Sequence, residues 1–323
     1  MAKTRFIYNP KAGAKRSLFF RHQPGLLLNS IHALLKKYEI EYDEAPTQQP
    51  GDARRLAAEA ARDGYDTVIV AGGDGTVGEA ANGLIGSDVA LGILPLGTFM
   101  NVARMLNIPF GLEQAVMVLK MRNIRLIDVG EILSIEGERP DEPTFFLESV
   151  GIGMEADFQN EFLAWERGDK AALGRFLRHG RQHYRHPMKV NLDNQRSFES
   201  KSHILTISNG PYSGNAVVVA PTAKLNDNLL TIRRYHLSKL ELIQHFLHLM
   251  LFGAHTEPRI EVYTSTTVQV TSKSQRPVHA DGRVFGMTPV SIKVRSKALK
   301  VIAGYPDSPK DSALLAKKTY LAP

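Results

Sequence analysis

The chain has 323 residues, a formal net charge of +7 and no cysteine. Its length allows two domains of ordinary size, and its hydrophobic content of 43% is normal for a folded chain with a substantial core. The lack of cysteine excludes a disulfide framework. No apolar run approaches the ~18 residues of a membrane-spanning helix, and no signal peptide precedes the first strand-like run, so we expect a cytoplasmic protein that contacts membranes peripherally at most. The positive charge favours anionic partners such as a nucleotide or an anionic lipid.

The first part of the chain alternates short apolar strands with segments of helical periodicity. The expected elements, in order, are a strand at 5–8, a helix over 18–38 interrupted near Pro24, a strand at 40–43, a helix from Asp52, a strand at 68–71, a helix over 77–85, a strand at 89–94 and a helix over 99–106. Alternation of this kind, up to about residue 122, is typical of an α/β domain with a mainly parallel sheet.

The buried strand at 68–71 stops abruptly at Gly72-Gly73-Asp74-Gly75-Thr76, directly before a helix. Glycines let the backbone approach an anion, and the free N–H groups of a helix start attract it. A second strand ends in a similar turn, Pro95-Leu96-Gly97-Thr98, so both turns should face one crevice where open α/β sheets bind ligands. Neither turn matches the two common phosphate loops. The alternative is that the glycines only serve packing and Asp74 caps a helix.

After Asp128 the pattern changes to alternation of apolar and polar residues at period two, which is typical of half-exposed antiparallel strands. It is seen at Val190/Leu192, Ile260/Val262, Val268/Val270 and Val290/Ile292/Val294. Helical patterning remains only over 155–184 and 238–252. We therefore expect an α/β nucleotide-binding domain at 1–130, an antiparallel β-sandwich lipid or substrate domain at 131–302, and a tail at 303–323 that carries a short helix over 313–318 and packs back on the first domain.

Ordered motifs along the chain resemble those of the diacylglycerol kinase catalytic domain, a family that includes bacterial soluble lipid kinases and sphingosine kinases. In the first half they are Asn9-Pro10-Lys11-Ala12-Gly13, Thr47 with Gly51-Asp52-Ala53, Gly72-Gly73-Asp74-Gly75-Thr76 and Leu96-Gly97-Thr98. In the second half they are Gly151-Ile152-Gly153, Asn209-Gly210, Ala220-Pro221 with Lys224-Leu225, and Asp281-Gly282. The glycine turn at 72–76 is shared with NAD kinases and phosphofructokinases, whereas the ordered set over 4–302 is specific to the lipid kinases.

This resemblance implies an ATP- and Mg²⁺-dependent lipid kinase that transfers the γ-phosphoryl group to a hydroxyl of diacylglycerol or a related lipid. ATP would lie in a cleft between the two domains, with Asp74 acting through Mg²⁺. The implied nucleotide-site residues are Asn9, Pro10, Lys11, Ala12, Gly13, Thr47, Gly72, Gly73, Asp74, Gly75, Thr76, Glu79, Gly97 and Thr98. Asp227, with the carbonyls of Lys224 and Leu229, would hold a structural Mg²⁺. The implied partner is a lipid at an anionic membrane surface, without nucleic acid, and a homodimer is left open.

The chain departs from the family pattern at three places. The turn Gly-Thr-x-Asn-Asp reads Gly-Thr-Phe-Met100-Asn101, and Leu-Asp-Asp-Gly reads Leu-Asn-Asp227-Asn. The family's Asp-Gly-Glu, whose Glu is taken as the general base, reads Asp-Gly-Arg283, and arginine cannot accept a proton. We therefore assign Asp74 as the catalytic base, and we expect Arg283 to contact a phosphate or the lipid headgroup. A binding homologue without turnover and a small-molecule kinase of the NAD-kinase type remain as alternatives.

Two further segments allow more than one interpretation. The cations between Arg167 and Lys189 either meet anionic lipid or form a solvated helix face. His179, His183 and His186 lie in the same segment, but no cysteine accompanies them as it does in many metal sites. The segment at 238–252 carries a wide apolar stripe made of Leu240, Ile243, Phe246, Leu247, Met250 and Leu251. Core packing is the expected role of this stripe, with a lipid-entry helix as the alternative if it is exposed.

Overall fold

The computed structural model describes residues 3–10, 24–154, 161, 164, 169–172, 174–175, 178, 185–214, 216–253 and 257–305. Lys11, Ala12 and Gly13, most of the helix expected over 155–184 and the one expected over 313–318 lie outside the described residues. Contacts divide the chain into two compact units. The first unit comprises the described residues up to Ile127 and from Lys297 onward, and the second comprises those from Asp128 to Ser296.

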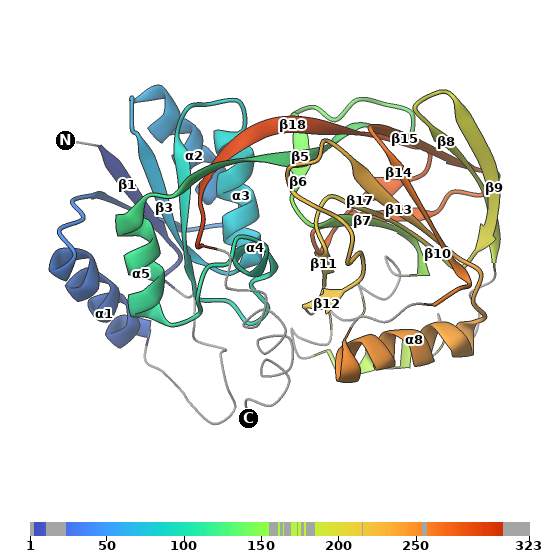
Figure 1. Ribbon diagram of the computed structural model, residues 1–323, viewed down its shortest axis with the longest axis horizontal. Helices are drawn as coiled ribbons and strands as arrows, with labels where there is room; N and C mark the ends of the chain where they lie inside the picture. Colours follow the sequence, from blue (N-terminus) through green and yellow to red (C-terminus); the bar gives the residue numbers. More distant parts are fainter. Residues whose placement is uncertain are drawn as a thin grey trace. The chain divides into compact units, whose positions relative to one another are not determined.

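The first unit contains a parallel sheet in the order β2-β1-β3-β4 (Figure 1). Its strands are β1 (Thr4–Tyr8), β2 (Asp43–Pro46), β3 (Thr67–Gly72) and β4 (Ala90–Pro95). The last residues of β18 (Val290–Ile302) add a further parallel strand beside β4, through Lys300 and Val301. Every residue of β3 and β4 is buried, which explains why these strands are continuous apolar runs in the sequence.

Helices cover both faces of this sheet. They are α1 (Pro24–Lys37), α2 (Asp52–Arg62), α3 (Asp74–Leu84), α4 (Asn101–Met105) and α5 (Leu112–Met121). Helix α2 packs against α3, and α1 lies beside α5 on the opposite side of the strands (Figure 1). The α2–α3 contact depends on Gly83, because a Cβ atom there would lie 2.3 Å from the carbonyl oxygen of Arg54. The expected α/β architecture of the first part of the chain is confirmed.

Two expected elements of this unit were placed wrongly. The strand expected at 40–43 begins only at Asp43, because Ile40 still bonds to the carbonyl of Leu35 at the end of α1. As an edge strand, β2 buries only Ala45, so apolar residues do not mark it. The helix expected over 99–106 is reduced to the five residues of α4, since Met100 has the left-handed φ of 50° and blocks an earlier start.

The second unit is an antiparallel sandwich, as expected. One sheet has the order β14-β13-β10-β7-β16-β17, and the other strands follow the order β18-β15-β8-β9, with β5 beside β18 and β6 beside β5. The strand bounds are β5 Ile124–Ile135, β6 Thr144–Phe146, β7 Ser149–Gly153, β8 His186–Leu192, β9 Arg196–Ser202, β10 Ile204–Ser208, β13 Leu230–Tyr235, β14 Ile260–Ser265, β15 Thr267–Ser272, β16 Pro277–Ala280 and β17 Arg283–Met287. A small separate pair is formed by β11 (Tyr212–Ser213) and β12 (Val217–Val218). Inward residues of both sheets, among them Val190, Ile207 and Val268, form one buried cluster.

Helix α8 (Lys239–Phe252) is the long helix of the second unit and matches the helix expected over 238–252. It begins with a capping box, in which Ser238 accepts the N–H of Glu241 and the Glu241 carboxylate accepts the N–H of Ser238. This reciprocal pair satisfies two of the N–H groups that a helix start leaves open. Among the described helices, none has both the length and the apolar character that crossing a bilayer demands.

We expect Gly83→Ala to destabilise the first unit by about 1–3 kcal/mol, because the added methyl group overpacks the α2–α3 contact. Gly78→Ala in the same helix is the matched control, since a Cβ atom there meets nothing within 4 Å. The control should gain up to ~1 kcal/mol from better helix propensity. Thermal unfolding of both variants measures the difference, and equal midpoints would contradict the packing argument.

Candidate active site

The carboxyl ends of β1, β3 and β4 lie along one edge of the parallel sheet. The register pairs Tyr8 with Ala71 and Gly72 with Pro95, so neighbouring strands end at the same level. Pairing continues one residue beyond β1, where the N–H of Asn9 donates to the carbonyl of Ala71 at 3.2 Å. The turns that follow these strands therefore leave the sheet side by side, at the edge where α/β proteins bind ligands.

Two of these turns approach each other so closely that only glycine fits. A Cβ atom on Gly97 would lie 2.7 Å from the Cα of Gly73 and 2.7 Å from the sulfur of Met100. A Cβ atom on Gly72 would lie 2.7 Å from the Cβ of Thr76. The two glycine turns are thus in contact through their backbones, with Gly73 against Gly97, while Gly72 is packed against Thr76 of its own turn.

Met100 stands where the resembled family motif has asparagine, and its side chain makes a hydrogen bond within this turn. Its sulfur accepts the N–H of Gly97 at 3.2 Å, although a thioether is a weak acceptor. Its side chain is fully buried, and its φ of 50° is a conformation that asparagine adopts more readily than methionine. The sulfur of Met100 therefore closes the turn at Gly97 in this chain.

Asp74 opens α3 at the end of β3, directly after the N-cap residue Gly73. It is half-buried, and one carboxylate oxygen accepts the N–H of Val102 at 3.3 Å. Burial raises the pKa of Asp74, and the N–H groups of Val102, Met100 and Asn101 oppose that rise only in part. A carboxyl group with a raised pKa at a strand end is typical of a functional site.

The loop after β2 is fastened to the same edge. The N–H of Thr47 donates to the carbonyl of Tyr8 at 2.9 Å, and a carboxylate oxygen of Glu79 accepts the N–H of Gly51 at 2.9 Å. The carboxylate of Asp52 accepts two further N–H groups of this loop, and these bonds lower its pKa. Thr47 and Glu79 are therefore near the predicted site, and Asp52, which the sequence marked only as part of a motif, is a positioning residue for this loop.

Asp281 has a structural role in the second unit. Its carboxylate accepts the N–H groups of Leu147, Glu148 and Ser149 at 2.7, 3.0 and 3.2 Å, which holds the turn between β6 and β7. Arg283 begins β17, the edge strand of its sheet, and its side chain is exposed. The Asp-Gly-Arg segment therefore presents a cation to solvent beside a carboxylate that backbone groups already occupy.

The predicted structural Mg²⁺ residues lie in one exposed loop. One oxygen of Asp227 accepts the N–H of Leu229 at 3.1 Å, and the loop is fixed by Asp128, whose buried carboxylate accepts the N–H of Asn228 at 2.6 Å. A carboxylate and main-chain carbonyls are the oxygen donors that Mg²⁺ prefers, so the residues fit such an ion. The described part of the chain brings no three His, Cys, Asp or Glu side chains together as a metal cluster.

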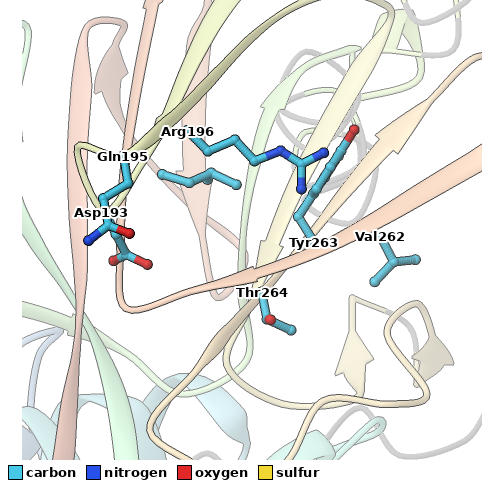
Figure 2. Close-up of a pocket in the computed structure, with 7 residues that line it drawn as sticks. Asp193, Gln195, Arg196, Val262, Tyr263 and Thr264 are labelled. Carbon is cyan, nitrogen blue, oxygen red and sulfur yellow. The ribbon is translucent and has the colours of Figure 1, made fainter.

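The second unit has a cavity of about 310 Å³ at the β8–β9 turn and β14. Figure 2 shows the side chain of Arg196 extending over the ring of Tyr263, with the guanidinium carbon 4.6 Å from the ring centre. Burial alone would raise the pKa of Asp193 in this cavity, but hydrogen bonds from Thr266 and Thr267 outweigh it and lower the pKa to about 2. The cavity contains none of the predicted site residues.

The cations of the segment 167–189 are in part neutralised where the structure describes them. Arg175 forms ion pairs with Glu161 at 2.8 Å and with Asp169 at 2.7 Å. Of the three histidines in this segment, His179 and His183 lie outside the described residues.

Comparison with known proteins agrees with this arrangement. Residues 3–132 match the diacylglycerol kinase catalytic domain, and residues 149–303 match the YegS C-terminal NAD kinase beta sandwich-like domain. The chain is 26% identical to a diacylglycerol kinase of Staphylococcus saprophyticus over 299 residues, which cover 89% of the chain and 90% of that relative. It is 32% identical to a Salmonella arizonae protein named "Probable lipid kinase YegS" over 215 residues, 64% of the chain and 68% of the relative.

Solved structures show the same fold. A diacylglycerol kinase from Bacillus anthracis superposes with a TM-score of 0.71 at 22% identity, covering 94% of the chain and 97% of that structure. Yeast NADH kinase superposes with a TM-score of 0.52 at 11% identity, covering 94% and 84%. The chain therefore belongs to the diacylglycerol kinase and YegS family of lipid kinases, and it shares the two-domain fold of these enzymes.

We expect the effect of Asp74→Asn on stability to depend on pH. Because the folded chain raises the pKa of Asp74 above the ordinary 3.8, ionisation costs folding stability as the pH rises past that value. The variant should unfold at about the wild-type temperature below pH 3.8 and at a higher temperature near pH ~7.

Asp52→Asn is the control of opposite sign, since the pKa of Asp52 is lowered and its stabilising effect is lost as the pH falls. The loss of folding stability in Asp52→Asn, relative to wild type, should be largest at neutral pH and should shrink in acid. Thermal unfolding across this pH range checks both variants, and an Asp74→Asn difference that is constant with pH would refute the burial argument.

Proposed function

We propose that this protein transfers the γ-phosphoryl group of ATP, with Mg²⁺, to a hydroxyl of diacylglycerol or a related lipid. The observation that carries this proposal is the contact of two glycine turns at one sheet edge, beside a half-buried carboxyl group whose pKa is raised. The family of the chain and the names of its relatives, diacylglycerol kinase and YegS lipid kinase, supply the lipid alcohol as acceptor.

The nucleotide would bind along the carboxyl edge of the parallel sheet. Backbone N–H groups of the turns at 72–76 and 97–98 and the start of α3 would hold the phosphates, since such groups form natural anion sites. Asn9, Pro10 and Thr47 would line the adjoining part of the site, together with Lys11, Ala12 and Gly13. Glu79 and Asp52 would act indirectly, by holding the 47–52 loop in place.

We assign Asp74 as the general base that accepts the proton of the lipid hydroxyl. The lipid hydroxyl oxygen forms a bond to the γ-phosphorus, the bond from that phosphorus to the bridging oxygen breaks, and ADP leaves with the electron pair. The hydroxyl proton passes to the carboxylate of Asp74, one oxygen of which also accepts the Val102 N–H. A raised pKa suits a general base, because its proton affinity is then closer to the working pH.

A Mg²⁺ ion at this site would neutralise the charge that develops on the phosphate oxygens. The carboxylate of Asp74 is the oxygen donor at the sheet edge that fits it. Arg283, which is exposed at the start of β17, would contact a phosphate or the lipid headgroup. The lipid would be taken from an anionic membrane surface, which the net charge of +7 favours.

A second function is favoured by one observation. Arg283 occupies the position where the resemblance implies a glutamate base, and arginine cannot accept a proton. If Asp74 does not replace that base, the chain binds nucleotide and lipid with little turnover and serves a regulatory role.

We expect Asp74→Asn to lower phosphoryl transfer by at least about 100-fold, because it removes the assigned base. The assay follows label from γ-labelled ATP into a panel of lipids presented in vesicles. Asp88→Asn is the matched control, since this exposed carboxylate pairs with Lys300 beside the amino end of β4, away from the glycine turns. Unchanged turnover of Asp74→Asn would exclude this residue as the base.

Arg283→Glu separates the two candidate functions. If Asp74 is the base, this variant should show no gain, and it should bind lipid vesicles more weakly because a cation becomes an anion. A several-fold gain in rate over both wild type and Arg283→Gln would instead show that a missing base limits turnover, and would favour the binding protein.

A further inference from the structure

Helix α8 exposes a row of large apolar side chains. Leu240, Ile243, Leu247 and Phe252 are 65%, 59%, 52% and 74% exposed. The first three have the spacing i, i+3, i+7, so they form one stripe along the outer face of the helix. We call these three residues the α8 stripe; Phe252, nine residues after Ile243, lies on another side of the last turn.

The opposite face of α8 packs against the hydrophobic core of its own unit. Leu242 and Leu249 are buried in two separate apolar clusters, and Phe246 packs against both. The α8 stripe is therefore additional to the packing of the helix on its own unit. A helix that packs one apolar face on its own unit and exposes a further row of large apolar side chains is typical of a surface that meets another apolar phase.

The charged groups at the start of α8 balance one another, so they do not oppose an anionic surface. Its acid, Glu241, accepts the N–H of Ser238 and pairs with Arg259, and these contacts lower its pKa to about 2. The other side chains on α8 that are described as exposed carry no negative charge. Lys239 lies at the start of the helix and His248 on its exposed side. Glu241 would thus meet anionic headgroups as part of an ion-pair network, in which Arg259 pairs with both Glu241 and Glu257.

The start of α8 is capped, and its length suits a helix that lies in a membrane interface. The capping box satisfies N–H groups at the start, and the N–H of Gly253 donates to the carbonyl of Leu249 at the end. A helix of 14 residues spans about 21 Å, enough to lie flat in the headgroup region with one face among the acyl chains.

We propose that the α8 stripe docks the enzyme on a lipid bilayer by lying in its interface. This inference rests on the proposed function, since a kinase whose acceptor is a membrane lipid has to meet the bilayer that contains it. It goes further by naming the surface that does so. A second copy of the chain is the other occupant that could cover an apolar stripe, and the experiments distinguish the two.

The first experiment uses the lack of cysteine in the chain. Leu247→Cys provides a single site for a nitrobenzoxadiazole label, and Met121→Cys on α5, which is 58% exposed, provides the matched control. With vesicles of phosphatidylcholine and phosphatidylglycerol, the label at 247 should shift to the blue and brighten, while the label at 121 should not. No shift at 247, or equal shifts at both sites, would overturn the proposal.

The second experiment compares two charge-matched double variants. Leu240→Asp with Ile243→Asp should reduce binding to the same vesicles at least tenfold, whereas Met117→Asp with Met121→Asp should leave it unchanged. Both pairs lie at exposed positions, and thermal unfolding verifies that both variants are folded. Unchanged vesicle binding of the α8 variant, or a change from dimer to monomer by light scattering without loss of binding, would contradict a bilayer as the occupant.

Activity towards a monomeric, short-chain diacylglycerol separates this inference from the proposed function. The α8 variant should phosphorylate that dissolved lipid at the wild-type rate and lose activity only on vesicles. Equal loss on both substrates would count against a docking role. If the wild-type protein phosphorylates no lipid yet binds vesicles through α8, the proposed function fails while the docking surface stands.

Discussion

The parallel register of β1, β3 and β4 is the constraint on which the candidate site depends. Because Tyr8 pairs with Ala71 and Gly72 with Pro95, the turns after these strands leave the sheet at one level. The contact of Gly73 with Gly97 follows from this register, and a side chain at Gly97 would force the turns apart. The chemistry assigned to Asp74 follows in turn, since the same turns partly bury its carboxyl group and raise its pKa.

Much of this arrangement could be predicted from the sequence, because buried parallel strands are apolar on both faces and end at glycines. The strands at 68–71 and 89–94 were found for that reason. The edge strand β2 was misplaced because it buries only Ala45, and its position is set by pairing with β1, which no local pattern encodes. The short α4 was overestimated because the left-handed conformation of Met100 depends on a tertiary contact, the bond from Gly97 to its sulfur.

The second unit shows a different limit of sequence reasoning. Alternation at period two predicted β8, β14, β15 and β18 but not β7 and β10, whose residues are all buried. It also could not show which apolar residues of α8 are buried. Only the structure shows that Leu242 and Leu249 are inside while Leu240 and Ile243 are outside. Likewise, the motif that contains Asp281 suggested chemistry, whereas three backbone N–H groups give that carboxylate a structural role. A motif therefore does not show by itself which of its residues bind a ligand, because the fold uses some of their polar atoms for its own hydrogen bonds.

The central claim is that ATP binds along the carboxyl edge of the parallel sheet. Hydrogen–deuterium exchange with and without ATP and Mg²⁺ tests it directly. We predict slower exchange in the peptides that contain the turns at 72–76 and 96–98, and no change in the β8–β9 turn at 192–196. Unchanged exchange at both glycine turns, with protection confined to the second unit, would contradict this account.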